Sequence, residues 1–491
     1  MKKIRIVALF LLFSLLLSSW VFATETQATE TEAEQTPVFQ ERLPEAPAVP
    51  QELNYPNELE LEAAAYALVE LKSNTIVHGK ELDALRYPAS LTKIMTCMLA
   101  IQYGNLNDVV TVSSSALEGL SIYGSTAGLV AGEEMTLENL LYCIMLWSAN
   151  EGCNVIAEYV CGDIDSFVAL MNRTAQALGM KNTQFANTHG LHDENHYTTV
   201  RDLIALSTWA WNNETFRRFA TATTHEVPAT NKSEARTLHT TNYLTSTDVD
   251  SRYYYSNASG IKTGFTTPAG GCLISTATDG DAQYLSILMG CDTKKEGKDM
   301  RFVETRRLFR HAFDSYTFVQ VLTDTNMLAQ PPVQNAEGRG DVVVHSKENA
   351  TVLLPVDYET KDILIKLRYD KELVAPLKQG ETVGSAVVEY QGLEIAKTEL
   401  VTLTAVDTPV QEPNNPEEDP KDDEPTRDPE DDTKKPAILS TIWRWIRIPL
   451  FLILGVVALA YIAICILSYI QRKRREKLRR QRRQRRRRYD A

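Results

Sequence analysis

A serine and a lysine three residues apart have the chemistry for nucleophilic catalysis in this sequence. They are Ser90 and Lys93, in the stretch Tyr87-Pro88-Ala89-Ser90-Leu91-Thr92-Lys93-Ile94-Met95-Thr96. Apolar residues recur after Pro88 at the spacing of one helix face, at Leu91, Ile94, Met95 and Met98. Pro88 suits the start of such a helix. Because residues three apart share a helix face, we predict that the Lys93 amine lies beside the Ser90 hydroxyl.

This pair fits the roles of nucleophile and general base. A serine hydroxyl is a weak nucleophile until a base takes its proton. An amine can be that base only while it is neutral, and the positive end of a helix dipole disfavours its ammonium form. The S-x-x-K spacing alone also occurs by chance in many helices, so its interpretation depends on other motifs.

Two more short motifs follow in the chain, Ser148-Ala149-Asn150 and Lys262-Thr263-Gly264. An asparagine carries both donors and an acceptor, which suits it to orient a lysine and a substrate amide. A glycine in a strand lets another backbone approach closely. Taken singly, Ser148 and Asn150 could simply end a helix, and the Lys-Thr-Gly run could be an exposed strand end.

Histidines gather in a polar stretch, at His189, His192 and His196, with Gly190 among them. His192 and His196 have the i, i+4 spacing of metal ligands, but their surroundings are typical of a loop rather than a helix. We therefore interpret His189 and Gly190 as structural loop residues, and we expect neither a metal nor another cofactor.

The elements that must position these residues form a domain with strands at both ends and helices between. Runs 65–71 and 75–78 predict a hairpin, and runs 272–277 and 284–289 predict another across Asp279-Gly280. Thr136 predicts a helix N-terminus, and the pattern from Phe302 to Phe313 predicts a closing helix. This order predicts a sheet built from N-terminal and C-terminal pieces and flanked by helices.

The two ends of the chain predict export and anchoring. Lys2, Lys3 and Arg5 precede an apolar run, and Val21-Phe22-Ala23 offers a cleavage site, as in a signal peptide; an uncleaved anchor is the alternative. Near the other end, residues 448–470 form an uncharged run long enough to span a bilayer. Trp443 and Trp445 border that run, and the Arg-rich tail beyond it is typical of the cytoplasmic side.

Composition shifts set the remaining boundaries, because short β-rich runs follow the first domain and a Pro-rich acidic segment follows those. We divide the 491 residues into a signal peptide (1–23), a flexible leader (24–57), a catalytic domain (58–317), a small β-rich domain (318–407), an acidic stalk (408–441), a transmembrane anchor (442–470) and a basic cytoplasmic tail (471–491).

Charge and cysteine content narrow the function. The net charge is −13 although residues 471–491 hold 13 Lys and Arg against two acidic residues, so the rest of the chain is strongly acidic. This argues against nucleic-acid binding by the main domain; nucleic-acid binding by the tail is a weaker alternative to its role beside the anchor. None of the seven cysteines forms a C-x-x-C pair. We interpret most of them as buried thiols, with structural disulfides as the alternative.

The motifs S-x-x-K, S-x-N and K-T-G in this order are the signature of penicillin-binding proteins and β-lactamases. With the strings Asn187-Thr188-His189-Gly190-Leu191 and Gly260-Ile261-Lys262-Thr263-Gly264-Phe265-Thr266, the chain resembles the serine-type D-alanyl-D-alanine carboxypeptidases over residues 58–406. The resemblance implies an α/β (α+β) domain with an antiparallel sheet flanked by helices, a small all-β domain and, here, a C-terminal transmembrane helix. Many family members use an amphipathic helix as anchor instead.

The resemblance also implies a role for each motif residue in releasing the terminal D-alanine of peptidoglycan stem peptides. Ser90 is the expected acyl-ester nucleophile and Lys93 the general base, Ser148 relays the proton, and Asn150 orients Lys93 and the substrate amide. Lys262 and Thr263 are expected to bind the substrate carboxylate, and Lys262 is the second cation that keeps Lys93 neutral. Gly264 lets the substrate lie along the strand, and the N–H groups of Ser90 and Phe265 form the oxyanion hole.

We therefore expect a hydrolase at the cell membrane whose catalytic domain lies outside the cytoplasm and whose inhibitors are β-lactams. A β-lactamase is an alternative, but the sequence identifies no glutamate for the deacylating water of class A enzymes. A D,D-endopeptidase, a transpeptidase and a non-catalytic penicillin-binding sensor also stay open.

Overall fold

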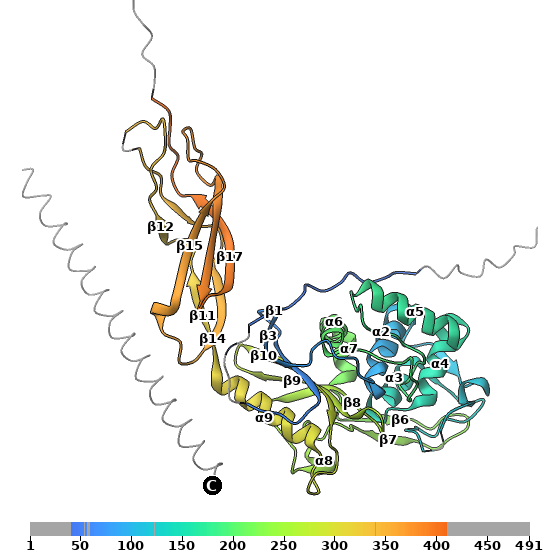
Figure 1. Ribbon diagram of the computed structural model, residues 1–491. Helices are drawn as coiled ribbons and strands as arrows, with labels where there is room; N and C mark the ends of the chain where they lie inside the picture. Colours follow the sequence, from blue (N-terminus) through green and yellow to red (C-terminus); the bar gives the residue numbers. More distant parts are fainter. Residues whose placement is uncertain (1–40, 54, 56–58, 122, 339, 410–491) are drawn as a thin grey trace, which may run out of the picture. The chain divides into compact units, whose positions relative to one another are not determined.

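The structure is a computed structural model that describes residues 41–53, 55, 59–121, 123–338 and 340–409. The chain divides into two compact units that join between His311 and Ala312 (Figure 1). The expected signal peptide, anchor and basic tail lie outside the described residues, as do most of the leader and nearly all of the stalk. Within the described ranges, no helix is both long and apolar enough to cross a bilayer.

The first unit is built on a six-stranded sheet in the order β1-β3-β2-β10-β9-β8 (Figure 1). Its strands are β1 (Gln51–Glu52), β2 (Ala65–Glu70), β3 (Thr75–Lys80), β8 (Ala258–Thr266), β9 (Gly270–Asp279) and β10 (Ala282–Cys291). β1 and β3 are parallel, whereas the other neighbours are antiparallel. The prediction of a sheet made from both ends of the domain is confirmed. Strand β8 with its Lys-Thr-Gly motif forms one edge of this sheet.

Most helices of this unit lie between the two groups of strands and the last helix follows them, as the sequence predicted. They are α2 (Lys93–Tyr103), α3 (Leu137–Leu146), α4 (Asn150–Cys161), α5 (Ile164–Ala177), α6 (Val200–Trp211), α7 (Glu214–Ala220), α8 (Thr247–Asp250) and α9 (Met300–Ser315), with the short 3-10 turns η1 (Ala89–Thr92) and η2 (Ser115–Leu117). The hydroxyl of Thr136 accepts a hydrogen bond from the Asn139 N–H at 3.3 Å. It thereby caps α3, as expected of a threonine at this position.

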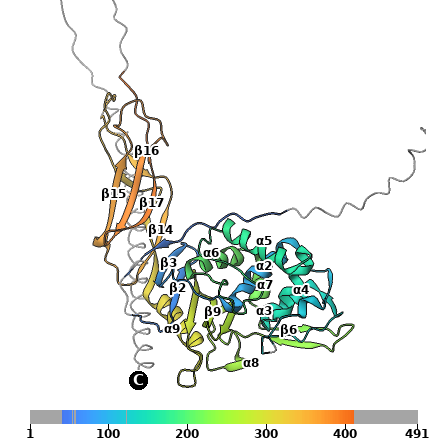
Figure 2. The ribbon, with the colours of Figure 1, turned by 45° about the vertical axis from the view of Figure 1, so that its right-hand side comes forward.

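Helices cover both faces of the sheet (Figures 1 and 2). Successive strand residues point to opposite faces. On β9, Ile274 accordingly packs into the large core with residues of α2 to α7, whereas Leu273 joins Phe302 of α9 in a separate cluster. All six residues of β2 are buried, as expected for a strand that is covered on both sides.

Turn chemistry fixes the hairpin between β9 and β10. Asp279 pairs with Ala282, so the two-residue loop is Gly280-Asp281 rather than the predicted Asp279-Gly280. Gly280 has φ +61°, which suits glycine at the first central position of a type II′ turn. Two further hairpins that the sequence did not reveal are β4 (Val109–Thr111) with β5 (Glu134–Thr136), and β6 (Thr224–Val227) with β7 (Arg236–His239).

Beyond residue 315, where α9 ends, the described part of the second unit is all β apart from the short turn η3 (Thr360–Asp362), which confirms the predicted β-rich domain. Its five-stranded sheet has the order β12-β13-β17-β16-β15. The strands are β12 (Met327–Ala329), β13 (Val344–Ser346), β15 (Ile363–Tyr369), β16 (Thr382–Tyr390) and β17 (Leu393–Thr402), and β11 (Tyr316–Leu322) pairs with β14 (Ala350–Pro355). Gln391 and Gly392 both have positive φ, as a type I′ turn between β16 and β17 requires. β11 begins two residues before the predicted start of this domain.

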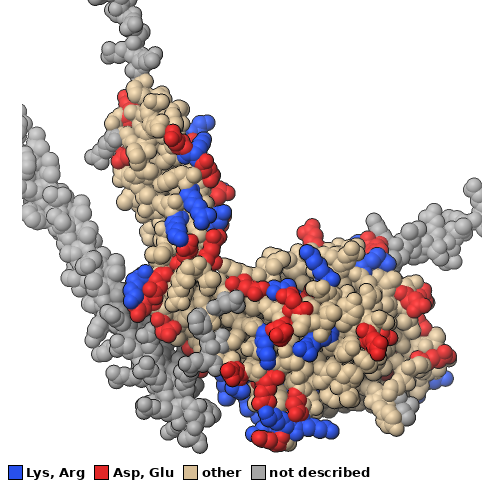
Figure 3. All heavy atoms as spheres, viewed as in Figure 1, with Lys and Arg blue, Asp and Glu red and all other residues tan. Residues whose placement is uncertain are grey.

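The described cysteines form no disulfides, and the charged side chains of the first unit are mixed in sign. The six cysteines described are free thiols, and all but Cys161 are buried. On the face shown in Figure 3, acidic and basic side chains are interspersed over the first unit.

Candidate active site

Ser90 lies on the 3-10 turn η1, directly before α2. The sequence predicted one continuous helix through Ser90, but α2 begins only at Lys93. The interruption comes from Ala89, whose φ of +48° lies in the left-handed region that a residue with a Cβ rarely adopts. The spacing argument survives, because the Lys93 Nζ lies 3.0 Å from the Ser90 Oγ.

The Lys93 amine is fully buried and has three hydrogen-bond acceptors. Besides the Ser90 Oγ, Nζ contacts the Asn150 Oδ1 at 2.8 Å and the His189 carbonyl oxygen at 2.6 Å. Burial lowers the pKa of Lys93 to about 8, although the neighbouring Cys153 and Glu151 act in the opposite direction. About a tenth of this amine is therefore neutral at pH 7, and a general base acts in its neutral form.

The Ser-x-Asn motif forms the junction between α3 and α4. Asn150 is the first residue of α4, and its N–H donates to the Ser125 carbonyl at 3.0 Å. Ser148 has φ +59° and is buried, and its Oγ has no hydrogen-bond partner among the described residues. The predicted helix ending is present, and the same turn presents Asn150 to Lys93.

Strand β8 runs along the nucleophile turn. A Cβ built on Gly264 would lie 3.0 Å from the Ser90 nitrogen and 3.2 Å from the Pro88 carbonyl oxygen, so only glycine leaves this gap open. The next residue, Phe265, has an exposed side chain. The Thr263 hydroxyl lies 2.6 Å from the hydroxyl of Thr241, a residue that the sequence did not single out.

Lys262 is buried, and its surroundings bear on its expected role as a cation. Its Nζ donates to the Thr263 carbonyl at 3.1 Å. Burial, followed by the nearby Lys93, lowers the pKa of Lys262 well below its usual value. The family resemblance implies that Lys262 is a cation that keeps Lys93 neutral. Lys93 disfavours the charge of Lys262 and has the larger set of hydrogen-bond acceptors.

The loop around His189 contributes to the site through its backbone, which sequence reasoning missed. The His189 carbonyl is a direct partner of Lys93, and the Thr188 hydroxyl donates to the Asn154 Oδ1 at 2.6 Å. Gly190 has φ +90°, and a Cβ there would lie 1.9 Å from the Ala89 carbonyl oxygen. Gly190 is the residue in this sequence stretch that could have indicated the close approach of the two backbones.

Arg301 at the start of α9 holds β8 in place and was also not predicted. Its Nη1 donates to the Gly264 carbonyl at 3.1 Å, while Nη2 pairs with Asp299 at 2.6 Å. Arg301 could not be predicted, because it contacts a backbone carbonyl and lies near the Lys-Thr-Gly motif only in the folded chain.

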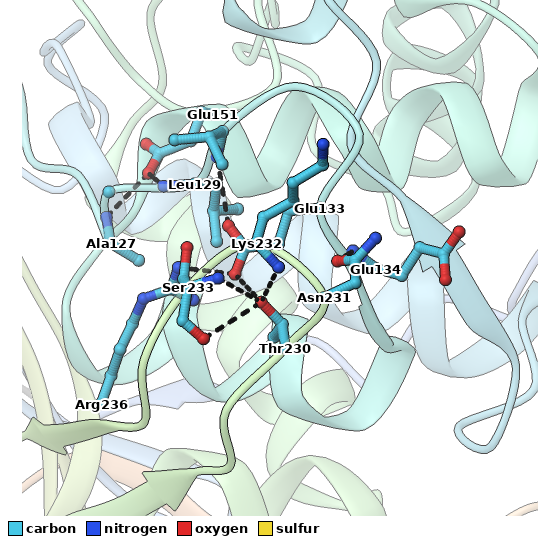
Figure 4. Close-up of polar contacts among 12 residues, drawn as sticks. Ala127, Leu129, Glu133, Glu134, Glu151, Thr230, Asn231, Lys232, Ser233 and Arg236 are labelled. Carbon is cyan, nitrogen blue, oxygen red and sulfur yellow. Dashed lines mark hydrogen bonds and ion pairs between the residues drawn. The ribbon is translucent and has the colours of Figure 1, made fainter.

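Two buried carboxylates fix the segment that faces Asn150 (Figure 4). The Glu151 Oε1 accepts hydrogen bonds from the Thr126 hydroxyl at 2.6 Å and from the Ala127 N–H at 2.7 Å. Glu133 pairs with Arg236 of β7 at 2.6 Å. These bonds connect the 126–133 segment to α4 and to the β6–β7 hairpin.

Comparisons with known proteins agree with this arrangement. A family model described as D-alanyl-D-alanine carboxypeptidase matches residues 52–293, and one described as penicillin-binding protein 5, C-terminal domain, matches residues 330–408. The chain is 28% identical to the D-alanyl-D-alanine carboxypeptidase DacF of Bacillus subtilis over 347 residues, which are 70% of this chain and 85% of that protein. It is 32% identical to a D-alanyl-D-alanine carboxypeptidase of Streptomyces sp. strain K15 over 230 residues, 44% of this chain and 77% of the relative.

A solved structure extends the match to both units. The crystal structure of penicillin-binding protein 5 from Haemophilus influenzae has a TM-score of 0.56 and 25% identity, and the match covers 72% of this chain and all of that one. The chain therefore belongs to the D-alanyl-D-alanine carboxypeptidase family of serine peptidases.

Proposed function

We propose that this chain removes the terminal D-alanine from peptidoglycan stem peptides through an acyl-enzyme on Ser90. The observation that carries the proposal is the fully buried Lys93 amine, 3.0 Å from the Ser90 hydroxyl and with a pKa lowered to about 8. A neutral amine at this distance can take the hydroxyl proton while the oxygen attacks.

The reaction has two halves. In the first, Lys93 takes the Ser90 proton as Oγ bonds to the carbonyl carbon between the two D-alanines. The C–N bond then breaks, and Ser148 relays a proton to the amine of the departing D-alanine. In the second half, a water molecule gives a proton to Lys93 as its oxygen bonds to the ester carbon. Lys93 then returns that proton to the Ser90 Oγ as the bond between Oγ and the carbon breaks, which releases the shortened peptide and restores both residues. The Ser90 and Phe265 N–H groups stabilise the oxyanion of each step, at about 3 kcal/mol for one such donor.

Lys262 and Thr263 bind the free carboxylate of the substrate. A bound carboxylate favours the ammonium form of Lys262, because an opposite charge raises the pKa of an amine. The cation formed in this way disfavours a second positive charge on Lys93. Substrate binding thereby promotes the neutral form of the base, and a substrate without a terminal carboxylate lacks this effect.

Release of D-alanine from a pentapeptide that ends in D-Ala-D-Ala tests the proposal. We expect release by the wild-type chain and none by Ser90→Ala. Equal release by both proteins contradicts the mechanism. Ser113→Ala, which removes a serine hydroxyl that bonds to Ser115 and Glu158, is the matched control and keeps its activity.

We further propose that β-lactams acylate Ser90 and stay bound. Supporting this, the Oε1 of the buried Glu151 beside Asn150 is already an acceptor for the Thr126 hydroxyl and the Ala127 N–H. Mass spectrometry of the intact chain after mixing with penicillin should show a lasting covalent adduct. A rapid return to the unmodified mass indicates a β-lactamase instead.

We also propose that the chain is held at the cell membrane by residues 442–470, with the catalytic domain outside the cytoplasm. The uncharged run 448–470, its flanking tryptophans and the basic tail support this.

A further inference from the structure

The residue directly before the nucleophile has a backbone conformation that needs support. Ala89 is buried and has φ +48°, which costs an alanine about 1 kcal/mol or more. The Lys93 N–H, which would bond to this carbonyl in an α-helix, bonds to the Ser90 and Leu91 carbonyls instead. A side-chain group that bonds to this carbonyl therefore helps to fix the orientation of the peptide, and with it the direction of the Ser90 side chain.

Thr92 supplies that group. Its hydroxyl donates to the Ala89 carbonyl at 2.8 Å and lies 2.7 Å from the Nε2 of His196. Both Thr92 and His196 are 1% exposed, so water does not replace either bond. Gly190 lies against the same carbonyl, where any side chain would collide with it.

The directions of these hydrogen bonds are determined by the partners. The Ala186 N–H donates to the Nδ1 of His196 at 3.0 Å, so Nδ1 carries no proton. In a neutral ring the proton is then on Nε2, which donates to the Thr92 oxygen. The Thr92 hydroxyl proton is thus directed at the Ala89 carbonyl, and the direction of each hydrogen bond from Ala186 to Ala89 is determined. Burial lowers the pKa of His196 to about 4, which keeps the ring neutral at working pH.

We propose that His196 is a positioning residue for the nucleophile, acting through Thr92 on the left-handed Ala89. His196 does not touch the reacting atoms. It determines which way the Thr92 hydroxyl points and so holds Ser90 at its distance from Lys93. This inference rests on Ser90 being the nucleophile, as proposed above.

The acylation rate of the full-length chain by a fluorescent penicillin, with the penicillin dissociation constant measured separately, tests this role. Thr92→Val removes the hydroxyl with little change in shape, and His196→Ala removes the ring. We expect each to slow acylation about 10- to 100-fold with little change in binding, since small displacements of reacting groups have effects of this size. His196→Gln, which can place an amide donor near the position of Nε2, should restore part of the rate.

The double variant Thr92→Val/His196→Ala shows whether His196 acts through Thr92 or independently of it. If His196 acts through Thr92, the double variant is about as slow as the slower single variant, because residues in one hydrogen-bond chain are not additive. Multiplied effects, or an acylation rate of Thr92→Val within twofold of wild type, overturn the proposal.

Two controls separate this role from folding and from the proposed function. Thr174→Val makes the same substitution at a buried hydroxyl of α5 without a hydrogen-bond partner among the described residues, and should acylate normally. Rates are expressed per acylated site at the end of the reaction, so unfolded molecules do not lower them. If Ser90→Ala is labelled as well as wild type, the proposed function fails, whatever His196 does.

Discussion

At the scale of single residues, two opposing effects set the charge of Lys93. Its three acceptors match the three N–H bonds of an ammonium ion, which favours the charged form. Complete burial favours the neutral form and is the larger effect, since the pKa falls to about 8. The site thus holds the amine in place in both forms, and a single proton separates the resting state from the active one.

This balance predicts the pH dependence of D-alanine release. The neutral amine is the base, so the rate should rise about tenfold per pH unit below pH 8 and level off above it. Measuring kcat/KM between pH 6 and 9 checks this. Lys93→Arg keeps a positive charge throughout this range and should be inactive. A wild-type rate that does not change over this range contradicts the assignment of Lys93 as the base.

Lys262 should bind the terminal carboxylate of the substrate. Losing a charged hydrogen bond of about 1.5–3 kcal/mol corresponds to a loss of about 10- to 150-fold. We therefore expect Lys262→Ala to lower kcat/KM by this factor on a peptide that ends in a free carboxylate. The same peptide with a C-terminal amide is the control, since its slow turnover should change little. An equal loss on both peptides means that Lys262 does not recognise the carboxylate.

At the scale of elements, the β6–β7 hairpin depends on a buried ion pair. Glu133 is completely buried, and Arg236 is its charged partner. Removing one partner leaves an uncompensated charge, so Arg236→Ala should lower the free energy of unfolding by about 3–5 kcal/mol in urea titration. Arg218→Ala breaks the ion pair of Arg218 with Glu138, in which the arginine side chain is about half exposed. This change should lower the free energy of unfolding by at most about 1 kcal/mol. Equal effects contradict this account.

The elements that the sequence predicted are those with local signals. The Thr136 cap, the hairpin turn at Gly280 and the helix-face spacing after Ser90 all act within a few residues. Helix α5 had such signals too, with Asp163 as its N-cap and apolar residues from Phe167 onward, and could have been found. The His189 carbonyl and the left-handed Ala89 could not, because a backbone acceptor has no side-chain signature and tertiary contacts stabilise the unusual φ.

At the scale of the whole molecule, catalysis and attachment are assigned to different parts of the chain. The site residues from Ser90 to Phe265 all belong to the first unit, which ends at His311. The expected stalk and anchor follow the second unit in the sequence, whereas the three acceptors of Lys93 among the described residues lie in the first unit. Activity on a dissolved peptide should then be independent of attachment.

A chain that ends at Asp407 tests this separation. It keeps both units and loses the stalk, the anchor and the basic tail, so it should move from the membrane fraction to the soluble fraction after ultracentrifugation. Its kcat/KM on a dissolved pentapeptide should stay within about twofold of the full chain, because every residue in the proposed mechanism is retained. A chain that lacks only the basic tail, ending at Ile470, is the matched control and should stay with the membrane, since about 20 apolar residues suffice to span it. A shortened chain that still sediments with membranes would place the attachment before Asp407 and contradict the proposed anchor.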